Sequence, residues 1–267
     1  MPPNSPQLSS ACAARRLILE EAHRAHVGHI GSALSVVDLL VALYGGIMHI
    51  RSPEDVERDR FILSKGHAAL ALYAVLFLRG WISREELATY CADNSRLGVH
   101  PSHHLRGVDF STGSLGHGLS VGAGAALAAR LQGKERRVFV LLSDAECNEG
   151  STWEAAMFAG HHCLSNLRAV IDVNGQQALG YTADVIDQSR MSERWKSFGW
   201  TVRKVDGHSP HQIAAAFDYA GDFPLVVLAD TISGKGVSFM ERQVGWHYMP
   251  MSDDEYTRAL AESDALP

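Results

Sequence analysis

Cysteines, long apolar runs and clustered basic residues are all scarce in this sequence. The 267 residues include only Cys12, Cys91, Cys147 and Cys163, and no pair of them has the CxxC spacing. Thiols in this pattern indicate a reducing compartment rather than a disulfide framework. No stretch approaches the roughly 18 apolar residues of a membrane span, and the amino terminus lacks the basic start and apolar core of an export signal. We therefore expect a cytoplasmic protein that does not bind a membrane.

The net charge and the length of the chain further limit the class of protein that it can belong to. With 24 basic against 30 acidic residues, the formal net charge is −6. The Lys and Arg residues form no stripe that could follow a phosphate backbone, which argues against nucleic acid as a partner. A hydrophobic content of 46% provides for one substantial core. We predict a single domain over residues 1–267, in which 235–267 form a carboxy-terminal extension.

Apolar runs of strand length alternate with helical patterns along most of the chain. The expected strands are 60–64, 137–142, 167–173, 201–205 and 225–230. The expected helices are 11–26, capped by Ser9 or Ser10, 34–44, 68–80, 84–90, 118–131, 149–162, 209–219 and 253–262. This alternation predicts an α/β fold with a mostly parallel sheet and helices on both faces. Residues 28–32 and 98–120, both rich in Gly and carrying His, are expected to be loops, the second of functional length.

Polar residues follow two of the predicted strands at the point where each ends. Asp144 comes shortly after the strand 137–142, and Asn174 directly follows the strand 167–173. Ligands of parallel sheets gather at the carboxyl ends of the strands. Carboxylate and amide oxygens suit a hard divalent ion whose other ligands are phosphate oxygens and water. This composition favours magnesium bound together with its ligand, although a plain hydrogen-bonding role for an Asp at a strand end stays equally open.

The segment from Asp144 to Asn174 resembles the thiamine diphosphate motif, which begins with Gly-Asp-Gly and closes with an Asn after the next strand. More narrowly, it is similar to the transketolase family. Further segments resemble that family in its order and approximate spacing: GHIGSALS (28–35), LSKGHAALALYA (63–74), GVHP (98–101), STGSLGHGLSVGAGAALA (111–128) and KGVSFMERQVGWH (235–247). The resemblance covers nearly the whole chain and implies the diphosphate-binding domain of a thiamine diphosphate enzyme.

Roles for individual residues follow from the resemblance. It implies that Mg²⁺ is bound by the Asp144 and Asn174 side chains and the backbone carbonyl of Gln176. The cofactor contacts that it implies come from His67, Gly113, Leu115, Ser143, Asp144, Ala145, Asn174 and His247. The implied catalytic residues are three substrate-channel histidines, His29, His100 and His247, with Glu149 at a subunit interface. Histidine suits proton transfer with sugar hydroxyls because its pKa lies near the operating pH.

In the transketolase family a second α/β domain supplies the glutamate that activates the cofactor and the aromatic pocket around its ring. This sequence ends near the point where that domain would begin. The resemblance therefore implies the amino-terminal subunit of a split transketolase. Such a protein moves a two-carbon ketol unit from a ketose, or ketose phosphate, to an aldose only with a carboxy-terminal partner. A heterotetramer with two copies of each subunit is the simplest assembly.

Four positions depart from the family pattern. Ser143 and Ala145 replace both glycines of the Gly-Asp-Gly turn, where glycine permits close backbone approach or positive φ. If Ala145 had to adopt positive φ, the strain would be on the order of 1 kcal/mol. His117 stands where Gln is common, and Tyr248 stands where Gly is usual. These departures put cofactor affinity and substrate identity in question, and they are compatible with a specialised sugar substrate.

Several alternatives stay open at the level of sequence. A protein resembling 1-deoxyxylulose-5-phosphate synthase, or another ligase or lyase, would use the same cofactor, although the histidines favour ketol transfer. The lost glycines could instead mark a non-catalytic subunit. A metallohydrolase would use some of His100, His103, His104, His161 and His162, but these lack an accompanying carboxylate pattern. A nicotinamide site is disfavoured because Gly122 and Gly124 have no strand directly before them.

Overall fold

A parallel sheet of five strands organises the protein, whose computed structural model describes residues 11–264. The strands are β1 (Arg60–Leu63), β2 (Val138–Ser143), β3 (Leu167–Val173), β6 (Thr201–Asp206) and β7 (Leu225–Asp230). They lie in the order β1-β2-β3-β7-β6, and each neighbouring pair is parallel. The predicted α/β fold is therefore confirmed, with β3 at the centre of the sheet.

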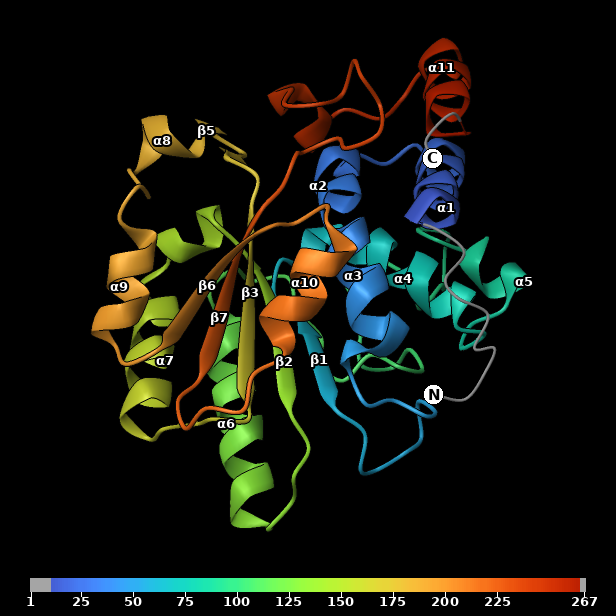
Figure 1. Ribbon diagram of the computed structural model, residues 1–267. Helices are drawn as coiled ribbons and strands as arrows, with labels where there is room; N and C mark the ends of the chain where they lie inside the picture. The colour runs from blue at the N-terminus through green and yellow to red at the C-terminus, as the bar shows by residue number, and fades with distance from the viewer. Residues whose placement is uncertain (1–10, 265–267) are drawn as a thin grey trace.

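Helices flank both faces of this sheet, as Figure 1 shows. They are α1 (Ala11–Ala25), α2 (Ile30–Ser35), α3 (Val37–Ala42), α4 (Ala69–Leu78), α5 (Arg84–Leu87), α6 (His117–Leu131), α7 (Gly150–His161), α8 (Thr182–Val185), α9 (Met191–Ser197), α10 (Pro210–Phe217) and α11 (Asp253–Asp264). A two-stranded antiparallel hairpin, β4 (Gln176–Gln177) with β5 (Gly180–Tyr181), follows β3. Within residues 11–264, no helix is both long and apolar enough to cross a membrane.

Side chains alternate across the sheet and divide the core into two layers. On β2, Phe139 and Leu141 face a layer built mainly from α1, α2, α3, α4 and α10. Val140 and Leu142 face the opposite layer, formed by α6, α7 and α9. Because both faces are covered, every β2 residue is buried, which explains its continuous apolar run.

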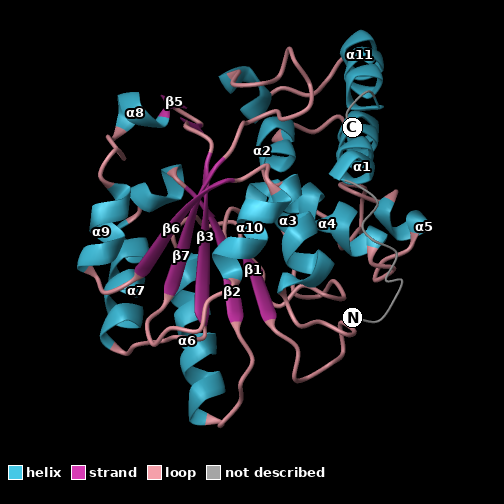
Figure 2. Cartoon of the chain, in the orientation of Figure 1, coloured by secondary structure: helices cyan, strands magenta, loops and turns pink. Residues whose placement is uncertain are grey.

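The carboxyl ends of the strands converge at one edge of the molecule. In Figure 2 they meet below the β4–β5 hairpin and α2. The segment after β7 leads to a short helical turn, Val244–His247, and then to α11, which packs against α1. Three segments that are distant in sequence therefore surround the strand ends: the residues around α2, the hairpin, and the arm that carries His247.

The structure differs from the sequence predictions at several elements, including the unpredicted β4–β5 hairpin and α8. The predicted helix 34–44 is divided at Val36, and its first part begins earlier, at Ile30, inside the segment expected to be a loop. Gly31 lets this early turn pack closely on the segment after β7, because an added Cβ would lie 2.7 Å from the Ser233 hydroxyl. The end of the predicted loop 98–120 belongs to α6, and α9, which buries Trp195 fully, was not predicted. Ser9 and Ser10, the predicted caps of the first helix, lie outside the described residues.

Two glycines of α6 give a matched test of this packing. A Cβ at Gly122 would lie 2.4 Å from a methyl carbon of Val140, whereas a Cβ at Gly124 would meet nothing within 4 Å. We predict that Gly122→Ala lowers the free energy of unfolding by about 1–3 kcal/mol through overpacking. Gly124→Ala should instead be neutral or raise it by up to about 1 kcal/mol, because alanine favours helix. Urea unfolding of both variants checks this, and equal effects would contradict the packing of α6 on β2.

Candidate functional site

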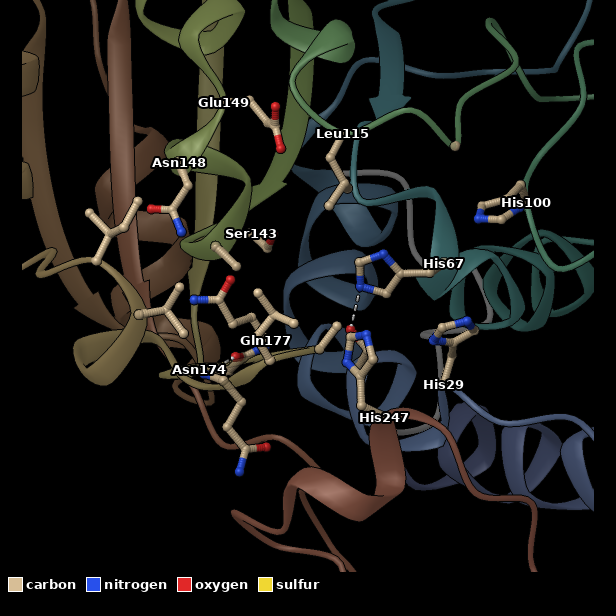
Figure 3. Close-up of a pocket in the computed structure, with 18 residues that line it drawn as sticks. His29, His67, His100, Leu115, Ser143, Asn148, Glu149, Asn174, Gln177 and His247 are labelled. Atoms are coloured by element: carbon tan, nitrogen blue, oxygen red, sulfur yellow. Dashed lines mark hydrogen bonds between the residues drawn. The ribbon is translucent and has the colours of Figure 1, made fainter.

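A cavity of about 450 Å³ opens at the carboxyl ends of the strands. Figure 3 shows it as a recess between the strand ends and the three surrounding segments. Its lining includes all but one of the residues predicted from sequence to form the site: His29, His67, His100, Gly113, Leu115, Ser143, Ala145, Glu149, Asn174, Gln176 and His247. The exception is Asp144, which lies buried at the end of β2, between two of these lining residues. The structure therefore brings the predicted residues together, while their roles stay predictions.

A buried ion pair lies beneath this cavity. The Lys65 ammonium, just after β1, is 2.5 Å from a carboxylate oxygen of Asp172 on β3, and neither side chain is exposed. The same oxygen accepts a hydrogen bond from the Ser35 hydroxyl at 2.8 Å. The other Asp172 oxygen accepts a hydrogen bond from the Thr231 hydroxyl, just after β7. Asp172 therefore joins β1, β3, β7 and α2 at one point.

Asn174 is held in place by this ion pair. Its amide nitrogen donates to Asp172 at 2.8 Å, and its carbonyl oxygen accepts from the Gln176 backbone N–H at 2.9 Å. Asp144 is fixed from the same side, because its carboxylate accepts the Gly175 N–H at 2.9 Å and the Thr182 hydroxyl at 3.1 Å. The ends of β2 and β3 are therefore cross-linked by hydrogen bonds to the predicted metal ligands themselves.

We call the residues at the ends of β2 and β3, Asp144, Asp172 and Asn174, the floor of the cavity. The charges of this floor favour a bound cation. Burial, and then the nearby charge of Asp172, raise the pKa of Asp144 to about 6. Asp144 and Asp172 are therefore two neighbouring buried carboxylates, and the Lys65 ammonium is paired with Asp172. A divalent ion would supply the missing positive charge, and Asp144, Asn174 and the Gln176 carbonyl form the all-oxygen ligand set that Mg²⁺ prefers. The residues at this point therefore fit the predicted ion.

The replaced glycines are accommodated without backbone strain. Within residues 11–264, the non-glycine residues with positive φ do not include Ala145, which begins a right-handed helical turn, Ala145–Asn148. The Ser143 hydroxyl accepts the Glu146 N–H at 3.1 Å, while the Glu146 carboxylate accepts the Ser143 N–H at 3.3 Å. This reciprocal pairing is of the capping-box type. The strain considered for Ala145 is therefore absent.

Glu146 also braces the start of α6. Its fully buried carboxylate accepts the Gly116 N–H at 2.7 Å and the hydroxyl of Ser64. Burial raises the pKa of Glu146, although these hydrogen bonds oppose that effect. These hydrogen bonds fix the position of one loop relative to the end of β2. That loop contributes Gly113 and Leu115 to the cavity.

Three histidines face one another on the other side of the cavity. The ring centroids of His29, His67 and His247 are 5.2–5.4 Å apart, although the residues come from three different segments (Figure 3). His67 shares a 2.8 Å hydrogen bond with the Ser32 hydroxyl. Among residues 11–264, His29 Nδ1 is one of the few buried polar atoms without a hydrogen-bond partner. The cluster therefore retains hydrogen-bonding capacity for a ligand.

The same cluster is held neutral. Burial, followed by the charge of Lys65, lowers the pKa of His67 well below its usual value. Burial and the neighbouring His29 lower the pKa of His247 to about 4, and burial also lowers that of His29. Neutral imidazoles can accept a proton from a hydroxyl or donate a hydrogen bond to a carbonyl, as general acid-base chemistry requires.

The remaining predicted residues lie at the rim. His100 and Glu149 are exposed, and Glu149 directly precedes α7. His100 also borders a second hollow of about 400 Å³ with His117, one of the positions that depart from the family pattern. Tyr248, another departure, donates its hydroxyl to the Ala178 carbonyl and so ties the His247 arm to the β4–β5 hairpin.

Sequence reasoning missed Lys65, Asp172 and Glu146, the buried charges that hold the site. A signal for two of them was present, because Asp172 interrupts an apolar strand and Lys65 directly follows one.

In the metallohydrolase alternative, His161 and His162 were grouped with His100. They end α7, which runs from the cavity edge of the sheet towards the opposite edge, away from His100. Within the part of the chain that the structure describes, no group of three or more His, Cys, Asp or Glu side chains could hold a metal ion.

The cavity lies at the carboxyl ends of the strands. On one side it has oxygen donors that suit a cation, and on the other it has three neutral histidines. These features define a cofactor-binding domain of the α/β class. Residues 7–262 match the family model "Transketolase, thiamine diphosphate binding domain". The chain therefore belongs to the transketolase family and forms its thiamine diphosphate binding domain, which confirms the predicted family and cofactor.

Several relatives of similar length are named as transketolase subunits. The chain is 40% identical over 253 residues to one subunit of the apulose-4-phosphate transketolase of Phocaeicola vulgatus, covering 93% of this chain and 90% of that protein. It is 39% identical to a 6-deoxy-6-sulfo-D-fructose transketolase subunit of a Clostridium species, covering 93% and 92%. The transketolase structure from Campylobacter jejuni superposes with a TM-score of 0.90 at 26% identity. That match covers 98% of this chain but only 43% of the longer one.

The neutral histidines predict a dependence of stability on pH. Because the folded pKa of His247 is about 4, below the usual 6.5, the unfolded chain binds its proton first as the pH falls. We expect the free energy of unfolding to decrease between about pH 6.5 and pH 4. His247→Gln should make this decrease smaller, which urea unfolding across the pH range can measure. An unchanged slope in the variant would show that His247 is not held neutral.

Proposed function

We propose that this chain is the cofactor-binding subunit of a two-component transketolase that moves a two-carbon ketol unit from a ketose to an aldose. The observation that carries the proposal is the meeting, around one cavity, of the oxygen donors on β2 and β3 with three neutral histidines. Thiamine diphosphate, when bound, supplies the carbon nucleophile that such a transfer needs. We take residues 1–267 as one domain, with the arm after residue 235 as its extension.

The roles of the residues follow from their positions. Asp144, Asn174 and the Gln176 carbonyl would hold Mg²⁺, and the cofactor's diphosphate would lie near Ser143 and Ala145. His29, His100 and His247 would orient sugar hydroxyls and exchange protons with them, and His67 would contact the diphosphate. The intact floor supports this proposal over a non-catalytic subunit, since the replacement of both glycines leaves the turn unstrained.

A partner subunit is the second part of the proposal. The cavity rim carries exposed apolar side chains, with Leu179 80% and Ile186 50% exposed. Apolar surface of this kind at a functional site is typical of a protein interface. We propose that the carboxy-terminal subunit covers this rim, near the exposed carboxylate of Glu149, and that two copies of each subunit form a heterotetramer. All four cysteines are free, which supports a cytoplasmic location.

The substrate is proposed to be a sugar or sugar phosphate. The sugars for which two relatives are named, apulose-4-phosphate and 6-deoxy-6-sulfo-D-fructose, carry an anionic group at one end. The residues that line the cavity within the described chain include no Lys or Arg. We therefore propose that this chain binds the uncharged end of the sugar and that the partner binds its anionic group.

Titration calorimetry with thiamine diphosphate and Mg²⁺ tests the cofactor site. We expect binding to this chain in complex with its partner, and loss of at least about tenfold in affinity in Asp144→Ala, because one metal ligand is removed. Asp230→Ala is the control, since Asp230 also ends a strand but is exposed and is not one of the predicted metal ligands. Equal affinities for the wild type and Asp144→Ala would contradict the site.

Substitution at the rim tests the partner surface. Leu179→Lys should weaken association with the carboxy-terminal subunit by about tenfold or more, because an apolar contact is replaced by a charge. The control is Leu131→Lys, at an equally exposed leucine that ends α6, away from the cavity. Sedimentation velocity of both variants with the partner gives the affinities. If the two substitutions weaken association equally, the partner does not dock on this rim.

A further inference from the structure

A second buried charge network lies outside the cavity. Arg15 on α1 is 2.5 Å from Asp38 on α3, and the same Asp38 oxygen is 2.6 Å from Nδ1 of His208. The exposed fractions of these three side chains are 7%, 10% and 13%. Replacing such a network with apolar side chains is often neutral or stabilising, so its presence is weak evidence for a role in stability.

The hydrogen bonds of His208 fix its protonation. Its Nε2 accepts the backbone N–H of Ile232 at 2.9 Å, so that nitrogen carries no proton. The proton is therefore on Nδ1, which donates to Asp38. Although burial opposes it, hydrogen bonding from His208 and Arg15 lowers the pKa of Asp38, which keeps the acceptor charged. The ring thus has one defined orientation, set by Asp38 and directed at Ile232.

Both ends of the network hold the same backbone segment. His208 binds the N–H of Ile232, and Arg15 Nε donates to the carbonyl of Lys235 at 3.2 Å. The segment Thr231–Lys235 directly follows β7, and the network fixes it at two points from one side. On its other side, the N–H of Gly234 donates to the carbonyl of Gly31 in α2 at 2.9 Å.

This segment lies between the parts of the chain that carry two of the clustered histidines. His29 directly precedes α2, and the arm that begins after Lys235 leads to His247. A Cβ at Gly31 would lie 2.7 Å from the Ser233 hydroxyl and 3.4 Å from Cβ of Trp246, so α2, the segment and the arm are in close contact. A shift of the segment would therefore separate His247 from His29.

We propose that His208 is a positioning residue that, together with Asp38 and Arg15, sets the segment Thr231–Lys235 and through it the distance between His29 and His247. The inference concerns backbone placement, and only its consequence for ligand binding rests on the proposed function. Its decisive contact is the Ile232 N–H, because that bond joins the network to the segment.

Two substitutions separate the bonds of His208. In His208→Asn the amide nitrogen can replace Nδ1 as the donor to Asp38, but no acceptor reaches Ile232. In His208→Gln the side-chain oxygen can replace Nε2 as the acceptor for Ile232, while the donor to Asp38 is lost. A purely structural role predicts that every effect follows the stability of each variant. A positioning role predicts that effects on the arm follow the Ile232 bond, whichever variant is less stable.

Hydrogen exchange of the full chain, and affinity for thiamine diphosphate with Mg²⁺ in the complex with its partner, test this. In His208→Asn we expect faster exchange in the segment and the arm, unchanged exchange in β2 and β3, and affinity lowered by about tenfold. In His208→Gln, exchange in the arm should resemble wild type and affinity should stay within about threefold.

Unchanged arm exchange in His208→Asn, or effects in both variants that simply follow thermal stability, would overturn the inference. If the wild type binds no thiamine diphosphate but His208→Asn still loosens the arm and His208→Gln does not, the proposed function fails while the positioning role of His208 is supported.

Discussion

The buried contact between Lys65 and Asp172 determines how the strand ends are arranged. Breaking such a pair by removing one partner costs about 3–5 kcal/mol, because an unpaired charge remains in the core. Here the pair also orients Asn174, and it receives hydroxyl groups from α2 and from the end of β7. A single carboxylate therefore connects the folding of the sheet to the shape of the cation site. The histidine side of the cavity depends on it indirectly, through α2 and the segment after β7.

Around this contact, the site divides into a charged floor and a neutral wall. The floor holds the carboxylates of Asp144 and Asp172. The Lys65 ammonium pairs with Asp172, which leaves the Asp144 carboxylate to attract a divalent ion. The three histidines of the wall are half-buried near the same lysine and stay uncharged. The charge of Lys65 thus pairs with Asp172 in the floor and lowers the pKa values of the histidines in the wall. A cofactor with a charged diphosphate and a neutral reacting ring would match the floor and the wall.

Continuous apolar runs allowed the strands to be predicted, with Leu167–Val173 and Leu225–Asp230 matching to the residue. The closeness of Asp144 and Asn174 followed from strands joined by one helix. The contacts of Lys65 with Asp172 and of His208 with Asp38 could not be predicted, because 107 and 170 positions separate the partners and no local pattern records them. Propensity also failed at α2, where packing against the arm allows a Gly-containing segment to be helical.

The structure of this chain in complex with its partner, with thiamine diphosphate and Mg²⁺ bound, tests the central claim most directly. The account predicts one ion shared by the Asp144 carboxylate, the Asn174 side-chain oxygen and the Gln176 carbonyl, while the Asn174 amide still donates to Asp172. An ion bound elsewhere, or an Asn174 side chain turned away from Asp172, would contradict it.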